Sequence, residues 1–180
     1  MCERLSAVEG ESNAMELTLR PILESDLPIF FEQQCDPDAR RMVAFCTAEP
    51  GDLAAFLAKW QTILADKNAL CRTIEVAGAV AGNLGHFMQF DRPSISYWLG
   101  RNYWGRGIAT RAVGAFVASI ERRPLYARVV SDNVGSLRVL ERCGFGVIGT
   151  ERDFAPIRGE EVEEFLLELP AAISSISSKI

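Results

Sequence analysis

The stretch NYWGRGIAT at residues 102–110 decides how the fold of this chain is predicted. Two glycines, Gly105 and Gly107, flank an arginine directly before a segment with apolar residues at helical spacing. Glycine lets a backbone approach a ligand closely, and the first turn of a helix presents unpaired amides that attract anions. The stretch therefore predicts a strand-to-helix turn, which is either purely structural or a backbone site for a phosphate.

The common nucleotide motifs do not explain this turn. A Walker loop requires G-x-x-x-x-G-K-[ST], and the dinucleotide fingerprint requires G-x-G-x-x-G. Gly105, Gly107 and Thr110 satisfy neither pattern. The function of the turn therefore has to be judged from the segments around it.

The composition is that of one globular domain. The chain has 180 residues, of which 48% are hydrophobic and 24% charged, and this length suits one full core better than two. The net charge of −5 disfavours nucleic acid, because neutralising phosphates needs a basic face. No apolar run reaches the roughly 18–20 residues that span a bilayer. We therefore expect a cytoplasmic protein with neither a nucleic-acid nor a membrane partner.

The cysteines and the histidine do not predict a metal site. The number of cysteines is odd, no C-x-x-C pair occurs, and His86 is the only histidine, so a zinc site at finger spacing is disfavoured. We expect no metal. Reduced thiols, most of them core side chains, are expected at Cys2, Cys35, Cys46, Cys71 and Cys143.

The two ends of the chain differ from its middle. Residues 1–14 are polar and aperiodic and lack the apolar region of a secretory signal, so they predict a leader or a disordered arm. Residues 15–169 are expected to form the domain. Residues 170–180 are expected to be a frayed tail.

Hydrophobic periodicity divides the domain into short elements. Alternation predicts strands at 15–20, 69–76, 80–90, 94–100, 124–130, 145–154 and 161–169. Helical spacing predicts helices at 25–34, 51–66, 108–121 and 133–143, with turns at 77–79, 91–93 and 156–160 and a break at 36–37. A hairpin-rich half followed by a βαβ-like half predicts a mixed α/β (α+β) fold around one sheet.

Apolar stripes on three of these helices predict core contacts rather than chemistry. Gly144 is expected to cap the helix that starts near residue 133. Pro28 fits the helix at 25–34 only in its first turn. The stripes comprise Leu53, Phe56, Leu57, Trp60, Ile63 and Leu64; Ile108, Ala112, Val113, Phe116 and Ile120; and Leu137 and Leu140, with Val139 as a further candidate.

The segment YWLGRNYWGRGIATRAV, followed by a strand and then SDNVGSLRVLERCGF, resembles the GNAT superfamily of acetyl-CoA-dependent N-acetyltransferases. The resemblance covers residues 15–169, and its specific part runs from Tyr97 to Phe145. Trp104 stands where the wider family has Gln or Arg, which is similar to the ribosomal-protein-alanine acetyltransferase (RimJ/RimL-like) branch. Asn133, Gly144 and Phe145 match the family's later helix.

The resemblance implies a single domain with a mostly antiparallel sheet, a splayed strand pair and helices on both faces. It implies that acetyl-CoA is the co-substrate. The pyrophosphate would meet the turn, and the pantetheine arm would lie along the preceding strand. Arg106, with Arg101 or Arg111 as further candidates, could add charge-assisted bonds to the phosphates; the alternative is that these arginines are solvated surface side chains. The expected coenzyme-binding residues are Trp98, Leu99, Gly100, Trp104, Gly105, Arg106, Gly107, Ile108, Ala109, Thr110 and Asn133.

The residues for the transfer chemistry are less complete. Leu140 occupies the place of the tyrosine that protonates the leaving thiolate in many family members. In the branch resembled, a serine at the position of Ser136 lies near the sulfur, which makes Ser136 a candidate donor to the thiolate. The alternative is that Ser136 bonds its own backbone in the first helical turn. Cys143 need not be a nucleophile and is expected to be a core side chain.

A general base is not evident either. Ser94 lies near the place of the family's glutamate. His86 is the catalytic candidate, because its ordinary pKa near 6.5 suits proton removal; the alternative is a structural histidine. Further candidates are a water relay and the side chains of Tyr97, Glu75 and Glu151.

The branch resembled implies a protein N-terminal amine as the acceptor. Residues 30–50 and the last hairpin would shape the acceptor groove. Small amines such as antibiotics and polyamines are alternative acceptors. A homodimer is an open alternative for the oligomeric state. A second hypothesis is a non-catalytic acyl-CoA-binding module or sensor, because the usual tyrosine and glutamate are missing. A third is another nucleotide enzyme that uses the same turn.

Overall fold

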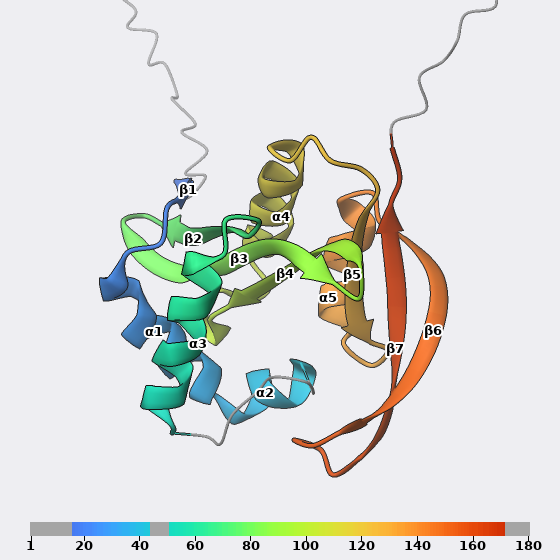
Figure 1. Ribbon diagram of the computed structural model, residues 1–180, viewed down its shortest axis with the longest axis horizontal. Helices are drawn as coiled ribbons and strands as arrows, with labels where there is room; N and C mark the ends of the chain where they lie inside the picture. The colour runs from blue at the N-terminus through green and yellow to red at the C-terminus, as the bar shows by residue number, and fades with distance from the viewer. Residues whose placement is uncertain (1–15, 44–50, 172–180) are drawn as a thin grey trace, which may run out of the picture.

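The computed structural model describes residues 16–43 and 51–171. Within them, one seven-stranded sheet has the order β1-β2-β3-β4-β5-β7-β6, and every neighbouring pair is antiparallel except β4 and β5 (Figure 1). The mixed, mostly antiparallel α/β fold is thereby confirmed. The strands are β1 (Leu17–Arg20), β2 (Leu70–Val76), β3 (Ala79–Gln89), β4 (Arg92–Leu99), β5 (Leu125–Val130), β6 (Gly146–Ala155) and β7 (Glu160–Leu169).

Helices cover both faces of this sheet. Cys71 packs with α1 and α3, whereas Ile74, three residues along β2 and so on the other face, packs with α4. Pro28 lies in the first turn of α1, as expected. The helices are α1 (Leu27–Cys35), α2 (Pro37–Val43), α3 (Leu53–Ala65), α4 (Ile108–Ala118) and α5 (Val134–Arg142), with short 3-10 turns at Glu24–Asp26 and Arg101–Tyr103.

Helix α2 was not predicted, because Asp36 and Pro37 were interpreted as a chain break. The Asp36 side chain instead accepts a hydrogen bond of 2.9 Å from the amide of Ala39, and Pro37 opens the helix. Proline is tolerated at this position because the first amides of a helix have no internal acceptor. An Asp-Pro pair before a short polar segment was therefore a usable helix-start signal.

Two-residue turns join β2 to β3 and β3 to β4. Their central residues all have positive φ: Ala77 and Gly78 in the first turn, Phe90 and Asp91 in the second. Two consecutive positive φ angles match the twist of a tight hairpin. The predicted turn at 91–93 was therefore displaced, and Pro93 lies inside β4, near its start, where one missing amide donor is tolerated.

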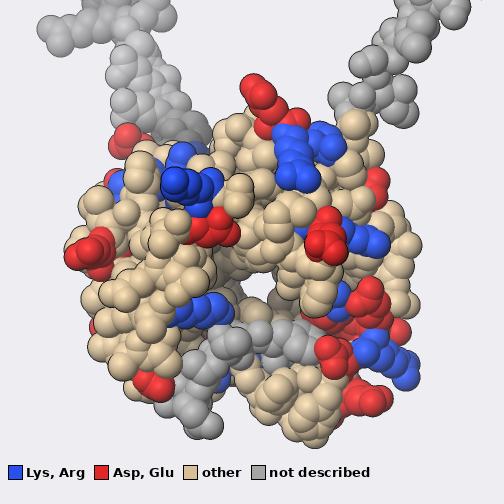
Figure 2. All heavy atoms as spheres, in the orientation of Figure 1, with Lys and Arg blue, Asp and Glu red and all other residues tan. Residues whose placement is uncertain are grey.

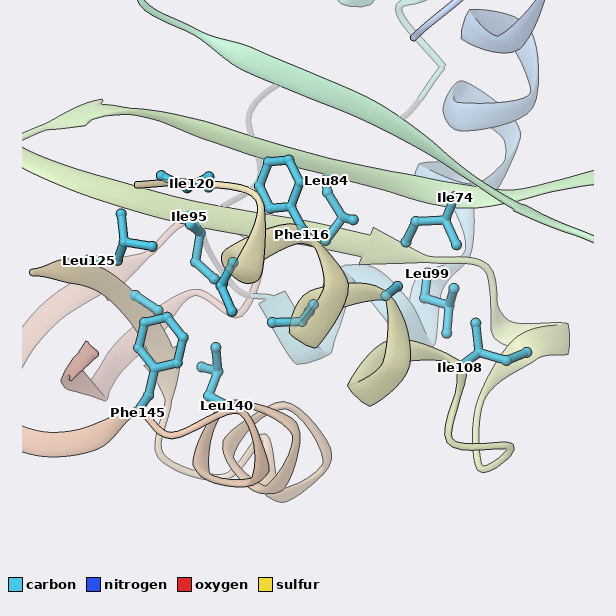
Figure 3. Close-up of a cluster of buried hydrophobic side chains, with 14 of the residues drawn as sticks. Ile74, Leu84, Ile95, Leu99, Ile108, Phe116, Ile120, Leu125, Leu140 and Phe145 are labelled. Carbon is cyan, nitrogen blue, oxygen red and sulfur yellow. The ribbon is translucent and has the colours of Figure 1, made fainter. Parts of the chain in front are cut away.

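The main core lies between the sheet and helices α4 and α5 (Figure 3). The predicted stripe of α4 is confirmed, since Ile108, Ala112, Val113 and Phe116 are all buried. The stripe of α3 is narrower than predicted: Phe56 and Trp60 are buried, and the exposed side chains are Leu53 and Leu64.

Gly144 ends α5 as predicted. The Phe145 amide bonds the Leu140 carbonyl at 3.1 Å, and the Gly144 amide bonds Glu141 at 3.0 Å. Gly144 has φ +93°, a conformation that favours glycine. Phe145 and Leu140 are both buried in the main core, so this cap also fixes the end of α5 against the sheet.

Strands β4 and β5 diverge after a single paired position. Ser94 opposes Tyr126 in parallel register, and no further β4–β5 pair forms among the described residues. The two strands are joined through α4, which is the usual crossover for parallel neighbours. The expected splayed pair is therefore present, and it opens a space between the second half of β4 and that of β5.

Several predictions concern residues outside the described ranges. These are the arm at 1–14, most of the tail at 170–180, Cys2 and Cys46. In the ranges that the structure describes, Cys35, Cys71 and Cys143 are unbridged. No helix found there is long and apolar enough to cross a membrane.

Candidate active site

A cavity of about 460 Å³ lies where β4 and β5 diverge. Figure 2 shows the molecule hollowed at its centre, between the side formed by α1 and α3 and the side formed by the β6–β7 hairpin. Residues 95–99 of β4 and 127–130 of β5 form its walls. The lining is completed by α2, the turn before α4, the N-terminal part of α4, α5 along its length, and Glu164 of β7.

The glycine turn forms one end of this cavity. Gly105 and Gly107 both have φ +72°, and no described atom lies within 4 Å of where a Cβ would stand on either. Gly107 directly precedes α4, whose first residues Ile108, Ala109 and Thr110 also line the cavity. The amides of a first helical turn lack internal acceptors and lie at the positive end of the helix dipole. This end of the cavity can therefore hold an anion.

Trp104 fixes the turn to the end of β4. Its indole N–H donates a hydrogen bond of 2.7 Å to the carbonyl of Leu99. Gly82 on β3 makes the same corner tight, because a Cβ there would stand 2.0 Å from the carbonyl oxygen of Trp98. The Trp104 side chain thus has a structural role in the turn in addition to lining the cavity.

The arginines near this end are arranged differently from the prediction. Arg106 is exposed and does not belong to the lining, and Arg101 forms an ion pair with Asp38. Arg138 and Arg142, one helical turn apart on α5, do line the cavity and were not predicted. Their i, i+4 spacing on an amphipathic helix was the signal available in the sequence.

Gly100 is the other expected coenzyme residue outside the lining. Its amide donates to the carbonyl of Ala81 at 2.9 Å. A Cβ at this position would stand 3.0 Å from Nε2 of Gln33, so the Gln33 side chain closes this side of the glycine. Trp98 and Leu99, by contrast, belong to the cavity wall. The structure therefore brings together ten of the expected residues, Trp98, Leu99, Trp104, Gly105, Gly107, Ile108, Ala109, Thr110, Asn133 and Ser136.

Asn133 and Ser136 organise the N-terminus of α5. The Asn133 Oδ1 accepts a hydrogen bond of 3.0 Å from the Ser136 amide, while its Nδ2 donates to the Met42 carbonyl of α2 at 3.0 Å. The Tyr97 hydroxyl donates to Ser136 Oγ at 2.9 Å. Burial raises the pKa of Tyr97 to about 12, so this phenol stays protonated at neutral pH.

The opposite end of the cavity combines apolar and charged groups. Ala39, Met42 and Val43 of α2 line it, together with Arg128 and Glu164. Arg128 bonds Glu164 at 2.8 and 3.1 Å and also forms an ion pair of 2.8 Å with Glu151. Glu164 is only 8% exposed, so the pairing with Arg128 offsets the cost of burying its charge.

Three proton-transfer candidates lie outside the cavity lining or are held elsewhere. His86 does not line the cavity; burial and the nearby Arg122 lower its pKa, and its Nε2 finds no hydrogen-bond partner among the described residues. Glu75 forms a 2.7 Å ion pair with Arg20. Glu151 is held by Arg128.

The positions that depart from the family pattern are both buried. Leu140 is 2% exposed in the main core, and the Ser94 hydroxyl bonds the carbonyl of Arg92. Cys143 packs partly buried against the same core, as predicted. Burial raises the pKa of its thiol, which suits a core side chain rather than a nucleophile.

Residues 16–146 match the acetyltransferase (GNAT) domain family, and the chain belongs to this family. An uncharacterized N-acetyltransferase p20 of Bacillus licheniformis is 30% identical over 101 residues, which make up 54% of this chain and 56% of that protein. The match thus spans little more than half the length of this curated relative. The predicted superfamily is confirmed.

Solved structures share the fold at lower identity. Spermidine N-acetyltransferase from Vibrio cholerae, determined with CoA and spermine, has a TM-score of 0.74 and 15% identity over 86% of this chain and 95% of that one. The microcin C7 self-immunity acetyltransferase MccE, determined with acetyl-CoA and AMP, has a TM-score of 0.70 and 21% identity over 86% and 92%. Because both identities are low, these two structures show that the fold is shared and show nothing about the substrate.

Proposed function

We propose that the protein transfers an acetyl group from acetyl-CoA to a primary amine by direct attack in a ternary complex. The observation that carries this proposal is one continuous cavity between the unpaired halves of β4 and β5. The cavity joins the anion-binding end at Gly105 and Gly107 to the hydroxyl of Ser136 and to the charged end at Glu164. It therefore connects a site suited to a phosphorylated donor with a site suited to an amine.

The donor would occupy the end formed by α4 and α5. The amides from Gly105 to Thr110 would hold the pyrophosphate. Arg138 and Arg142 supply positive charge on the cavity wall, and Arg106 lies next to the turn. The backbone of Trp98 and Leu99, which lies beyond the one β4–β5 pair, would take the pantetheine arm like an added strand, with Gly100 and Asn133 at the two borders of that path.

An acceptor that arrives as an ammonium ion first releases one proton to water, because only the neutral amine has a lone pair. The neutral nitrogen then attacks the thioester carbon, the C–S bond breaks, and the nitrogen loses a second proton while the sulfur gains one. Ser136 would donate a hydrogen bond to the sulfur as negative charge develops there. Because His86 is not part of the cavity lining, we assign removal of the amine proton to water at the acceptor end. Positioning the two substrates supplies much of the remaining rate enhancement.

The acceptor we propose is a cationic primary amine. Acidic side chains gather over the β6–β7 hairpin beside the central opening (Figure 2), and Glu164 lies within the cavity. Such a surface attracts positively charged acceptors. A protein N-terminus, as in the ribosomal-protein-alanine branch, and a polyamine, as in the Vibrio cholerae enzyme, both satisfy this description.

An acceptor panel with detection of the released thiol tests the proposal. Spermidine, an alanine-initiated basic peptide and the same peptide with an acetylated N-terminus form a matched set. We expect thiol release with spermidine or the free peptide and none with the blocked peptide. Tight acetyl-CoA binding without release by any amine would instead support a non-catalytic acyl-CoA sensor, the alternative raised by Leu140 and Ser94 in place of the family's tyrosine and glutamate.

A further inference from the structure

We propose that Tyr97 is a positioning residue that directs the hydroxyl proton of Ser136 toward the sulfur of the bound donor. This inference deepens the proposed acetyl transfer and rests on it. Tyr97 lies in the second half of β4, and Ser136 lies in the first turn of α5. The two side chains thus meet at the cavity although the residues are 39 positions apart in the chain.

The hydrogen bond from Tyr97 leaves the hydroxyl proton of Ser136 free to be donated elsewhere. Tyr97 donates to Ser136 Oγ at 2.9 Å, so one lone pair of that oxygen is occupied. The Ser136 backbone is held separately, because its amide donates to Asn133 Oδ1 at 3.0 Å. A hydroxyl that accepts from a neighbour still has its own proton to donate. Both side chains line the cavity, so that proton is available to a group within it.

Tyr97 does not itself have to release a proton. Burial raises its pKa to about 12, far above the range of a thiol. Its O–H therefore remains a donor while the C–S bond breaks, and Ser136 keeps its proton and stabilises the sulfur through a hydrogen bond. The proton gained by the sulfur is the one lost by the amine, so the balance of the reaction is unchanged.

The position of this pair also accounts for the leucine at position 140. Leu140 lies one helical turn after Ser136 on α5 and is buried in the core at 2% exposure. Leu140 itself lines the cavity, but its aliphatic side chain offers no proton donor there. Tyr97 brings a phenol to Ser136 from the neighbouring strand, with its ring packed against the same core.

The pKa of the thiol of enzyme-bound CoA, followed by thiolate absorbance, tests this inference without an acceptor. We expect Tyr97→Phe and Ser136→Ala each to raise that pKa by about one unit, and the double variant to match Ser136→Ala alone. Tyr126→Phe removes the same hydroxyl from β5, outside the cavity lining, and should leave the thiol pKa unchanged.

The kinetic counterpart is a lower kcat with an unchanged KM for acetyl-CoA. We expect Tyr97→Phe to lower kcat about tenfold, as for one lost transition-state hydrogen bond, and to have little effect in the Ser136→Ala background. Two results would overturn the role of Tyr97 but leave the proposed function standing. One is normal CoA binding with an unshifted thiol pKa in Tyr97→Phe, and the other is additive pKa shifts in the double variant. Absence of CoA binding by the unaltered protein would overturn the proposed function as well.

Discussion

Arg158 and Asp132 form a two-pronged contact that joins the last hairpin to the start of α5. The guanidinium nitrogens of Arg158 lie 2.6 and 2.9 Å from the two carboxylate oxygens of Asp132, and its Nε donates to the Arg41 carbonyl at 2.8 Å. Although it comes from a turn, the Arg158 side chain is only 5% exposed. With the Asn133–Met42 bond, this contact fixes α2 over the proposed acceptor end of the cavity.

We expect Arg158→Ala to raise the KM for the amine acceptor about fivefold to tenfold, because α2 loses one of its anchors. The affinity for acetyl-CoA should change less, since α4 and its turn are untouched. Arg158→Lys should not restore the acceptor KM, because an ammonium cannot form the same fork. Arg152→Ala is the control: Arg152 is on the same hairpin but 74% exposed. Equal effects of the two alanine variants would contradict the anchoring role.

Gly107→Asp is expected to weaken CoA binding by at least about tenfold, measured by calorimetry. The new side chain would stand in open space in front of the first amides of α4, with the same charge sign as a phosphate. Gly78→Asp provides the control, since Gly78 also has positive φ and open surroundings but lies in the β2–β3 turn. An unchanged affinity in Gly107→Asp would refute the assignment of the anion site.

Gly82→Ala should lower the melting temperature by about 5 °C or more, as overpacking typically does in a chain of this size. Its Cβ would stand 2.0 Å from the Trp98 carbonyl, and a backbone atom cannot rotate away. Gly85→Ala on the same strand is the control, since its nearest contact is the Cys71 side chain at 3.6 Å. If thermal unfolding shows the two variants to be equally stable, the tight β3–β4 corner is not as described.

Acid stability is expected to depend on Asp26. Burial alone raises the pKa of this carboxyl, but hydrogen bonds from Arg20, the Leu23 amide and Thr73 outweigh it and lower the pKa from 3.8 to about 2. A depressed folded-state pKa means that this stabilisation is complete above pH 4 and is lost as the pH falls from about 4 to about 2.

Asp26→Asn should therefore be less stable than the unaltered protein at neutral pH and should show a smaller loss of stability between pH 4 and pH 2. Denaturant unfolding at several pH values measures both effects. Glu24→Gln, on the same short turn, is the control. Parallel pH profiles for Asp26→Asn and the unaltered protein would contradict the role of Asp26.

Local patterns in the sequence were sufficient for most elements and for one end of the cavity. The buried stripe of α4 and the cap at Gly144 follow from residues within one or two helical turns of each other. The glycine turn was found in the same way, because positive φ and a helix start are both local properties.

Two kinds of feature escaped the sequence analysis. Helix α2 was missed because its start, Asp36–Pro37, is also a common break signal, and its place over the cavity depends on distant partners such as Arg158. Arg138 was missed because an exposed arginine on an amphipathic helix is usually a solvated surface residue. Only the tertiary structure shows that Arg138 lines the cavity.

The sequence by itself determined the mixed α/β class, the positions of most helices and strands, and the glycine turn at Gly105 and Gly107 that we propose as the anion site, since these depend on periodicity and backbone preference. The tertiary structure alone decided which strand pair stays open and which side chains meet there. The contact between Tyr97 and Ser136 joins a strand to a helix 39 positions away. Such a contact depends on how β4 and α5 pack on the shared core, which no local pattern specifies.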